Sequence, residues 1–190
     1  LDDAEEAWIT LRDKDDGKII YAGDPDEVYV AAVDYYGTVN RAVSNGDGTF
    51  DAVEQVAENV YNYGYGIGIA DFDADGDLDI ITSHSDGNLY LIEKTGTGNS
   101  YGTPVNIGDG GNNYYDLAVG DFDEDGMIDF VTMYGYYYPN YNNFWHNNGD
   151  GTFTMNSNAV ASGSTWYNYA NCVGDFNDDG HLDIVIAYSY

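Results

Sequence analysis

One acidic block occurs three times in this 190-residue chain, and the repetition constrains the fold more strongly than any other feature. The copies are residues 71–80 (DFDADGDLDI), 121–130 (DFDEDGMIDF) and 175–184 (DFNDDGHLDI). They begin at positions 71, 121 and 175, so the spacing is 50 and then 54 residues. Repeats of this length are typical of propellers and solenoids, in which each repeat is one supersecondary unit.

Short β-branched segments flank each block and favour strands over helices. The predicted strands lie before the blocks at 67–70, 117–120 and 171–174, and after them at 78–82, 128–132 and 182–187. A third strand at 88–92 leads toward a turn, which reads NGDGTF at 45–50 and 148–153 and has a looser form at 96–103. With a fourth strand before the next block, each repeat has the four strands of a propeller blade.

The expected fold is therefore an all-β propeller of four-stranded antiparallel blades, with about three and a half to four blades present. We expect a degenerate N-terminal blade at 1–60, whose acidic loop has shrunk to 23–26 and is not expected to bind metal. Calcium-binding blades follow at 61–110 and at 111–163, the latter with an aromatic insertion, and an incomplete one at 164–190. Such an array is either partial or completed by another strand or chain.

Alternating carboxylates in a tight loop turn their oxygens inward, which suits a hard cation with six to eight oxygen ligands. Glycine at position 6 supplies the sharp turn, and position 7 is expected to offer its backbone carbonyl. The candidate ligands of the first loop are Asp71, Asp73, Asp75, Asp77 and Asp79; those of the second are Asp121, Asp123, Asp125, Met127 and Asp129; those of the third are Asp175, Asn177, Asp179, His181 and Asp183.

The ligand set favours calcium, at about three ions per chain. An EF-hand would need a glutamate at position 12 and a second helix, whereas Thr82, Thr132 and Ile186 stand there within β-type segments. Magnesium retains more waters, and transition metals prefer histidine or cysteine. The alternative is a solvated turn without metal, which would leave several carboxylates in mutual repulsion.

The composition of the chain excludes some classes of binding partner. The formal net charge of −29 argues against nucleic acid and against anionic membrane surfaces. With 43% hydrophobic and 16% aromatic residues the chain should fold, and no apolar run is long enough for membrane insertion. The single cysteine, Cys172, cannot form an internal disulfide, and the start at Leu1 suggests a mature or excised segment.

The three DxDxDGxxD or DxNxDGxxD loops, each followed by a β segment, together with the two NGDGTF turns, resemble the FG-GAP/VCBS repeat family. Its calcium-binding propeller blades occur in integrin α-subunits and in many secreted bacterial and archaeal proteins. The resemblance covers roughly residues 20–190 and implies that the loop aspartates are calcium ligands. The degenerate first repeat and the incomplete last one depart from the family pattern.

Aromatic segments are expected on the face opposite the calcium loops. The tyrosine six residues before each block (Tyr65, Tyr115 and Tyr169) should pack between repeats, because a repeated position usually has a repeated structural role. A long insertion and a second aromatic segment are candidates for stacking on a sugar or gripping a protein. The candidate ligand-binding residues are Tyr136, Tyr137, Tyr138, Tyr141, Trp145, Trp166 and Tyr167.

No nucleophile motif accompanies these features, so we do not expect an enzyme. We expect instead a secreted or cell-surface, extracellular module for binding or cell adhesion, with a glycan or protein partner. One alternative is a structural subunit of a calcium-dependent assembly or filament that self-associates through open blade edges. The other is a non-catalytic domain of a carbohydrate-active enzyme.

Overall fold

The computed structural model describes residues 11–12, 19–21, 29–33, 37–45, 47, 49–57, 64–96, 100–109, 114–134, 142–160 and 168–188. Within these ranges the protein is all-β, without a helix, and every strand pairing is antiparallel. The described part of the chain therefore offers no helical segment with the length and hydrophobicity of a membrane span.

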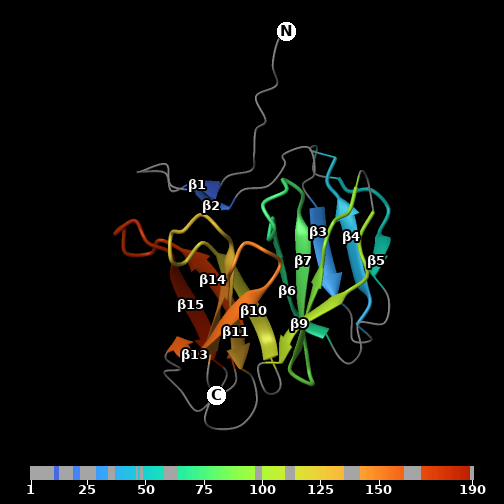
Figure 1. Cartoon of the computed structure of the whole chain (residues 1–190). Coiled ribbons are helices and arrows are strands. Elements are labelled where there is room, and N and C mark those ends of the chain that lie inside the picture. Colours follow the sequence, from blue (N-terminus) through green and yellow to red (C-terminus); the bar gives the residue numbers. More distant parts are fainter. Residues whose placement is uncertain are drawn as a thin grey trace.

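The strands form successive sheets that stand side by side (Figure 1). A small sheet pairs β1 (Leu11–Arg12) with β2 (Ile19–Tyr21), and a three-stranded sheet contains β3 (Tyr29–Val33), β4 (Val39–Val43) and β5 (Glu54–Ala57). A four-stranded sheet contains β6 (Gly64–Ala70), β7 (Asp79–His84), β8 (Asn88–Ile92) and β9 (Val105–Asp109). A second contains β10 (Tyr114–Gly120), β11 (Asp129–Tyr134), β12 (Asn142–Asn147) and β13 (Phe153–Val160). The last sheet pairs β14 (Asn168–Gly174) with β15 (Asp183–Tyr188).

The three acidic blocks have the same position in their sheets. Each lies between the first two strands of a sheet, and the pairs that close it are Ala70 with Asp79, Gly120 with Asp129, and Gly174 with Asp183. The strands predicted on both sides of the blocks are confirmed: those before the blocks begin three residues earlier than predicted, and those after them begin one residue later and end one or two residues later. This shared register means that the repeated sequence produces a repeated backbone.

Neighbouring sheets pack through their first strands: β3 on β6, β6 on β10, and β10 on β14. Glycine makes the close approach of β6 to β10 possible. A Cβ atom at Gly68 would lie 2.6 Å from Cγ1 of Val119, and one at Gly66 would lie 2.9 Å from the Cα atom of Asp116. Larger residues at these two positions would push the sheets apart.

A polar contact joins the next pair of sheets. Asp116 on β10 accepts hydrogen bonds from the backbone N–H of Asn171 (3.0 Å) and from its side-chain Nδ2 (2.6 Å). The same Nδ2 donates to the carbonyl of Leu117 at 3.0 Å. Burial raises the pKa of Asp116, while the backbone N–H of Leu117 and the two hydrogen bonds that Asp116 accepts from Asn171 oppose this shift. Asn171 is therefore a specific polar link between β10 and β14.

Trp145 lies in the main hydrophobic core, between the two four-stranded sheets. Its side chain is 3% exposed, its ring stacks on Phe130 with centroids 5.5 Å apart, and its Nε1 donates to Oγ1 of Thr132 at 3.1 Å. Gly108 on β9 leaves room for the indole, since a Cβ there would be 2.6 Å from it. The expectation that Trp145 contacts a ligand is corrected: alternation on β12 turns it toward the core.

The corresponding space between the second four-stranded sheet and β14–β15 is an open apolar groove of about 490 Å³. Apolar residues of both sheets line it together with two loop aspartates: Phe122, Val131, Phe144, Ala159, Val160, Leu182 and Ile184, with Asp123 and Asp183. Within the described residues β15 pairs with β14 alone. In the described part of the chain, this side therefore combines the outer edge of β15 with the groove.

Candidate metal centre

The three acidic loops share an unusual backbone. Position 4 has a positive φ in each loop, at Ala74 (61°), Glu124 (64°) and Asp178 (61°). Non-glycine residues rarely adopt this left-handed conformation. The glycines at position 6 also have positive φ, as the sequence predicted for the sharp turn. The positive φ at position 4 could not be predicted from the sequence, because alanine, glutamate and aspartate occupy this position.

Backbone N–H groups hold the loop carboxylates inward. The carboxylate at position 1 accepts from the position 6 glycine: Asp71 from Gly76 at 3.1 Å, Asp121 from Gly126 at 3.2 Å and Asp175 from Gly180 at 2.7 Å. The carboxylate at position 5 accepts from position 7 of the same loop, over 2.8 to 3.0 Å. Position 7 residues Asp77, Met127 and His181 therefore share a backbone role despite their different side chains.

The aspartate at position 9 ties its loop to the sheet. Asp79 and Asp129 are 1% and 0% exposed. Their Oδ2 atoms accept from Phe72 (3.1 Å) and Phe122 (3.3 Å), and their Oδ1 atoms accept from the backbone of Lys94 and Asn147, both at 2.9 Å. In the third loop Asp183 accepts from Phe176 at 3.1 Å.

The structure brings the predicted ligands of the first two loops together. Ligand atoms lie within 4.8 Å of one another in three groups: Asp71 with Asp73 and Asp79; Asp121 with Asp123 and Asp125; and Asp123 with Asp129 and His146. In the third loop Asp179 donates its N–H to both Asp175 (3.1 Å) and Asn177 (2.9 Å), which repeats the first loop with an amide in place of one carboxylate.

Ionising these carboxylates is costly without a cation. Burial, together with repulsion from Asp73 and Asp75, raises the pKa of Asp79 to about 7 despite two backbone hydrogen bonds. Burial and the charge of Asp123 raise the pKa of Asp129 to about 6. The pKa values of Asp71, Asp73 and Asp121 are also raised, mainly by burial. A bound cation would relieve this unfavourable electrostatic energy.

The donor set fits a hard cation such as calcium. In the second loop Oδ1 of Asp121 is buried and has no hydrogen-bond partner among the described residues. A buried carboxylate oxygen without a partner is rare unless an ion or water satisfies it. Together with the other inward-facing oxygens of the loop, this atom provides the oxygen-rich environment that calcium prefers.

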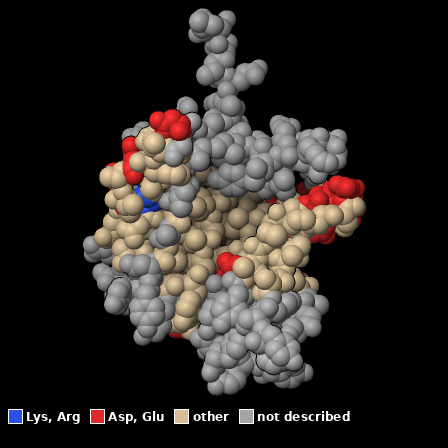
Figure 2. All heavy atoms as spheres, turned by 180° about the vertical axis from the view of Figure 1, so that it is seen from behind, with Lys and Arg blue, Asp and Glu red and all other residues tan. Residues whose placement is uncertain are grey.

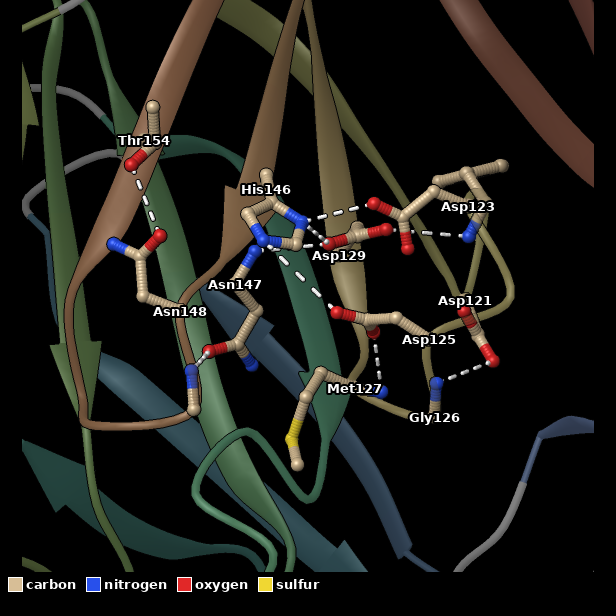
Figure 3. Close-up of polar contacts among 12 residues, drawn as sticks. Asp121, Asp123, Asp125, Gly126, Met127, Asp129, His146, Asn147, Asn148 and Thr154 are labelled. Atoms are coloured by element: carbon tan, nitrogen blue, oxygen red, sulfur yellow. Dashed lines mark hydrogen bonds and ion pairs between the residues drawn. The ribbon is translucent and has the colours of Figure 1, made fainter.

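Two side chains outside the blocks contact these loops, and neither was predicted to do so. Lys94, 5% exposed, donates from Nζ to Oδ1 of Asp77 at 3.1 Å. His146 places Nδ1 3.0 Å from Oδ2 of Asp123 (Figure 3). Lys94 lies two residues after the end of β8, and His146 is the last residue but one of β12, so both precede the turn that follows the third strand of their sheets.

Other predicted features are mostly outside the described residues. These are the shrunken loop at 23–26 and the aromatic residues Tyr136, Tyr137, Tyr138, Tyr141, Trp166 and Tyr167. Of the repeated tyrosines, the side chain of Tyr65 is 39% exposed. Viewed from behind, exposed Asp and Glu form separate patches, the larger ones toward the upper left and the right and a smaller one near the middle, with other residue types between them (Figure 2).

The raised pKa values predict an unusual pH dependence for the chelator-treated protein. Asp79 and Asp129 bind protons more tightly in the folded than in the unfolded chain, so their stabilising contribution is complete below about pH 4 and is lost as the pH rises through about 6 to 7. Without metal, the free energy of unfolding should therefore rise as the pH falls from 8 to 5. The slope approaches about 1.4 kcal/mol per pH unit for each group.

Urea denaturation at several pH values in chelator would measure this dependence. Asp79→Asn, which cannot ionise, should flatten the curve, and saturating calcium should reverse it, because the metal binds the ionised carboxylates. Metal-free stability that increased between pH 5 and pH 8 would contradict the assignment.

The geometry defines a class of protein: an all-β repeat protein in which three of the sheets have an acidic loop, of a kind that could hold a metal ion, between their first two strands. The FG-GAP-like repeat model matches residues 22–82, 71–132 and 131–186. The chain therefore belongs to the FG-GAP-like repeat family, and its repeats are β-propeller-like.

No curated protein matches the chain. Among solved structures, the fold is similar to that of a lectin from Agrocybe aegerita, described in terms of specific recognition of non-reducing terminal N-acetylglucosamine. The TM-score is 0.50 at 16% sequence identity, and the match covers 90% of this chain and 49% of the lectin chain. The present chain thus spans about half the length of that structure, and the likeness concerns the fold.

Proposed function

We propose that this chain is a calcium-stabilised, extracellular binding module, built as propeller blades and presenting a surface to a glycan or protein partner. The observation that carries the proposal is the clustering of mutually close carboxylates in the first two loops, where burial raises the pKa of Asp79 and Asp129. Calcium at about three loops would neutralise these groups and fix each loop against its sheet. The role proposed is binding, not catalysis.

The packing of first strand on first strand supports a propeller arrangement, in which about three and a half to four blades surround a common axis. Family membership and the fold of the lectin are compatible with a partner on the outer surface. A glycan is the first partner to test, because the tyrosines and tryptophan at 134–141 and 166–169, which do not include the buried Trp145, are residue types that suit stacking on sugar rings.

Calorimetric titration of the chelator-treated chain with calcium, alongside thermal unfolding, tests the proposal. We expect about three ions per chain and a stabilisation of roughly 2.7 kcal/mol per site at a hundredfold excess over Kd. Asp71→Asn should remove one site, because position 1 is aspartate in all three loops, while Asp51→Asn, the same charge change at an exposed residue outside the loops, should remove none. Absence of both binding and stabilisation up to about 10 mM calcium, beyond the weakest extracellular sites, would refute the metal role.

A glycan array probed with calcium and with chelator tests the partner. Binding to a defined set of sugars only in calcium supports the module, whereas uniform absence of binding to glycans directs the search to protein partners. Secretion can be checked separately by locating the protein in cell fractions of its source.

Calcium-dependent self-assembly is a second candidate, favoured by the edge of β15, which pairs with no strand other than β14 among the described residues, and by the adjoining groove of about 490 Å³. A sheet edge and an apolar groove together can accept a strand from another chain. Light scattering during the calcium titration distinguishes the two: an increase in particle size favours assembly, and a constant monomer favours the binding module.

A further inference from the structure

The second acidic loop differs from the other two in having a histidine ring directed into it. His146, at the end of β12, lies with Nδ1 3.0 Å from Oδ2 of Asp123 and 3.5 Å from Oδ1 of Asp129. Its other nitrogen, Nε2, is 3.9 Å from Oδ2 of Asp125. Figure 3 shows the ring pointing at these three carboxylates from the opposite side of the loop.

The contact between His146 and Asp123 is close without being a hydrogen bond. Nδ1 is buried and has no hydrogen-bond partner among the described residues, although Oδ2 of Asp123 is only 3.0 Å away. A protonated Nδ1 engaged in a simple ion pair would direct its N–H at the carboxylate. Two ligand atoms about 3 Å apart also correspond to neighbouring positions around one metal ion, given metal–ligand bonds of about 2.0–2.2 Å.

Asp129 is placed to act as the third ligand of a metal ion. Asp129 is fully buried, and its Oδ1 accepts the backbone N–H of Asn147 at 2.9 Å. A carboxylate oxygen has two lone pairs, so this hydrogen bond leaves one for a metal and also orients the group. The cluster of Asp123, Asp129 and His146, with ligand atoms within 4.8 Å of one another, therefore combines two oxygens and one imidazole nitrogen.

The first loop has a different residue at the equivalent place. Glu93 directly precedes Lys94, whose backbone N–H donates to Asp79, just as His146 directly precedes Asn147, whose backbone N–H donates to Asp129. The first loop also receives the ammonium group of Lys94 at Asp77, and an ammonium group cannot ligate a metal. In the third loop His181 contacts Glu124 of the second loop from an exposed position, with 68% of its side chain accessible.

We propose that His146 adds a nitrogen ligand to the second loop and makes this loop, unlike the other two, a site for imidazole-binding divalent metals, with zinc as the representative ion. Zinc accepts histidine and carboxylate ligands together, whereas calcium takes oxygen alone. The proposal rests on the metal-binding role of the loops and extends it: all three loops would accept calcium, and the second loop would in addition accept an imidazole-binding metal.

The test uses the full chain, treated with chelator and labelled with ¹⁵N-histidine. Zinc is added alone, and the imidazole nitrogen resonances of His84, His146 and His181 are followed together with calorimetric binding. We expect a stoichiometric shift of the His146 resonances. His146→Gln should lower zinc affinity by about tenfold or more, because a side-chain amide is not among the usual zinc ligands. His146→Glu introduces the residue type of Glu93, the equivalent position beside the first loop. This variant should preserve calcium-induced stabilisation, which would show that the loop still folds.

His181→Gln is the matched control, because it removes an exposed histidine from a neighbouring loop and should leave zinc affinity unchanged. Zinc affinity equal in wild type and His146→Gln, or zinc shifts confined to His181, would overturn the proposal. Calcium binding without a zinc shift at His146 would refute this inference and leave the proposed function intact. A zinc shift at His146 without calcium binding would support the inference and refute the calcium role.

Discussion

Trp145→Ala is expected to lower the free energy of unfolding by about 3–5 kcal/mol, the usual loss for a large aromatic residue removed from a core. The indole is 3% exposed, stacks on Phe130 and fills the space above Gly108, so its removal leaves a cavity between the two four-stranded sheets. It also removes the hydrogen bond to Thr132. Urea denaturation in calcium would measure the change.

Trp145→Phe is the control for this prediction, because phenylalanine can retain the stacking on Phe130 while losing the indole N–H. It should cost clearly less than the alanine variant. If Trp145→Ala cost less than about 1 kcal/mol, the tryptophan would have to be a surface residue, and its role as a ligand contact would return.

Asp129→Ala is expected to be the most damaging change within a loop. It leaves the backbone N–H groups of Asn147 and Phe122 without their acceptor, and each unsatisfied buried donor costs about 1–3 kcal/mol. The free energy of unfolding should therefore fall by about 2–5 kcal/mol when measured in calcium, where the variant also lacks a metal ligand.

Asp123→Ala distinguishes the loss of a metal ligand from the loss of hydrogen bonds to the sheet. Asp123 belongs to the same loop and contacts His146, but it is 41% exposed. In chelator, where no metal contributes, Asp123→Ala should be neutral or stabilising, since it removes a repulsive charge, while Asp129→Ala should still destabilise. Equal effects of the two variants in chelator would mean that Asp129 does not hold the loop to the sheet.

The sequence predicted the parts of the fold that depend on local chemistry. Glycine at position 6 and alternating aspartates specify the loop, and β-branched residues on both sides specify the strands, so the first two strands of each repeat were located correctly. The turn at 148–153 also follows from its residues: Asn148 donates its backbone N–H to the carbonyl of Thr152 at 3.0 Å. These interactions span only a few residues.

Contacts between distant residues could not be predicted in the same way. The link between Asp116 and Asn171 spans 55 residues and is absent from the preceding repeat, where Gly66 occupies the position of Asp116. The placement of His146 at the second loop depends on where β12 ends relative to β11. Trp145 looked like one member of an exposed aromatic segment, and only its register on β12 assigns it to the core.

The unequal burial of the sheets has a consequence for local opening. All six residues of β7 are buried, whereas the described side chains of β15 are exposed or partly buried on a sheet of two strands. In an array where each sheet packs mainly on its neighbours, the least covered unit opens at the lowest free energy. Amide hydrogens of β14 and β15 should therefore exchange with solvent well before those of β7, so that this end of the molecule can rearrange while the central sheets keep their structure.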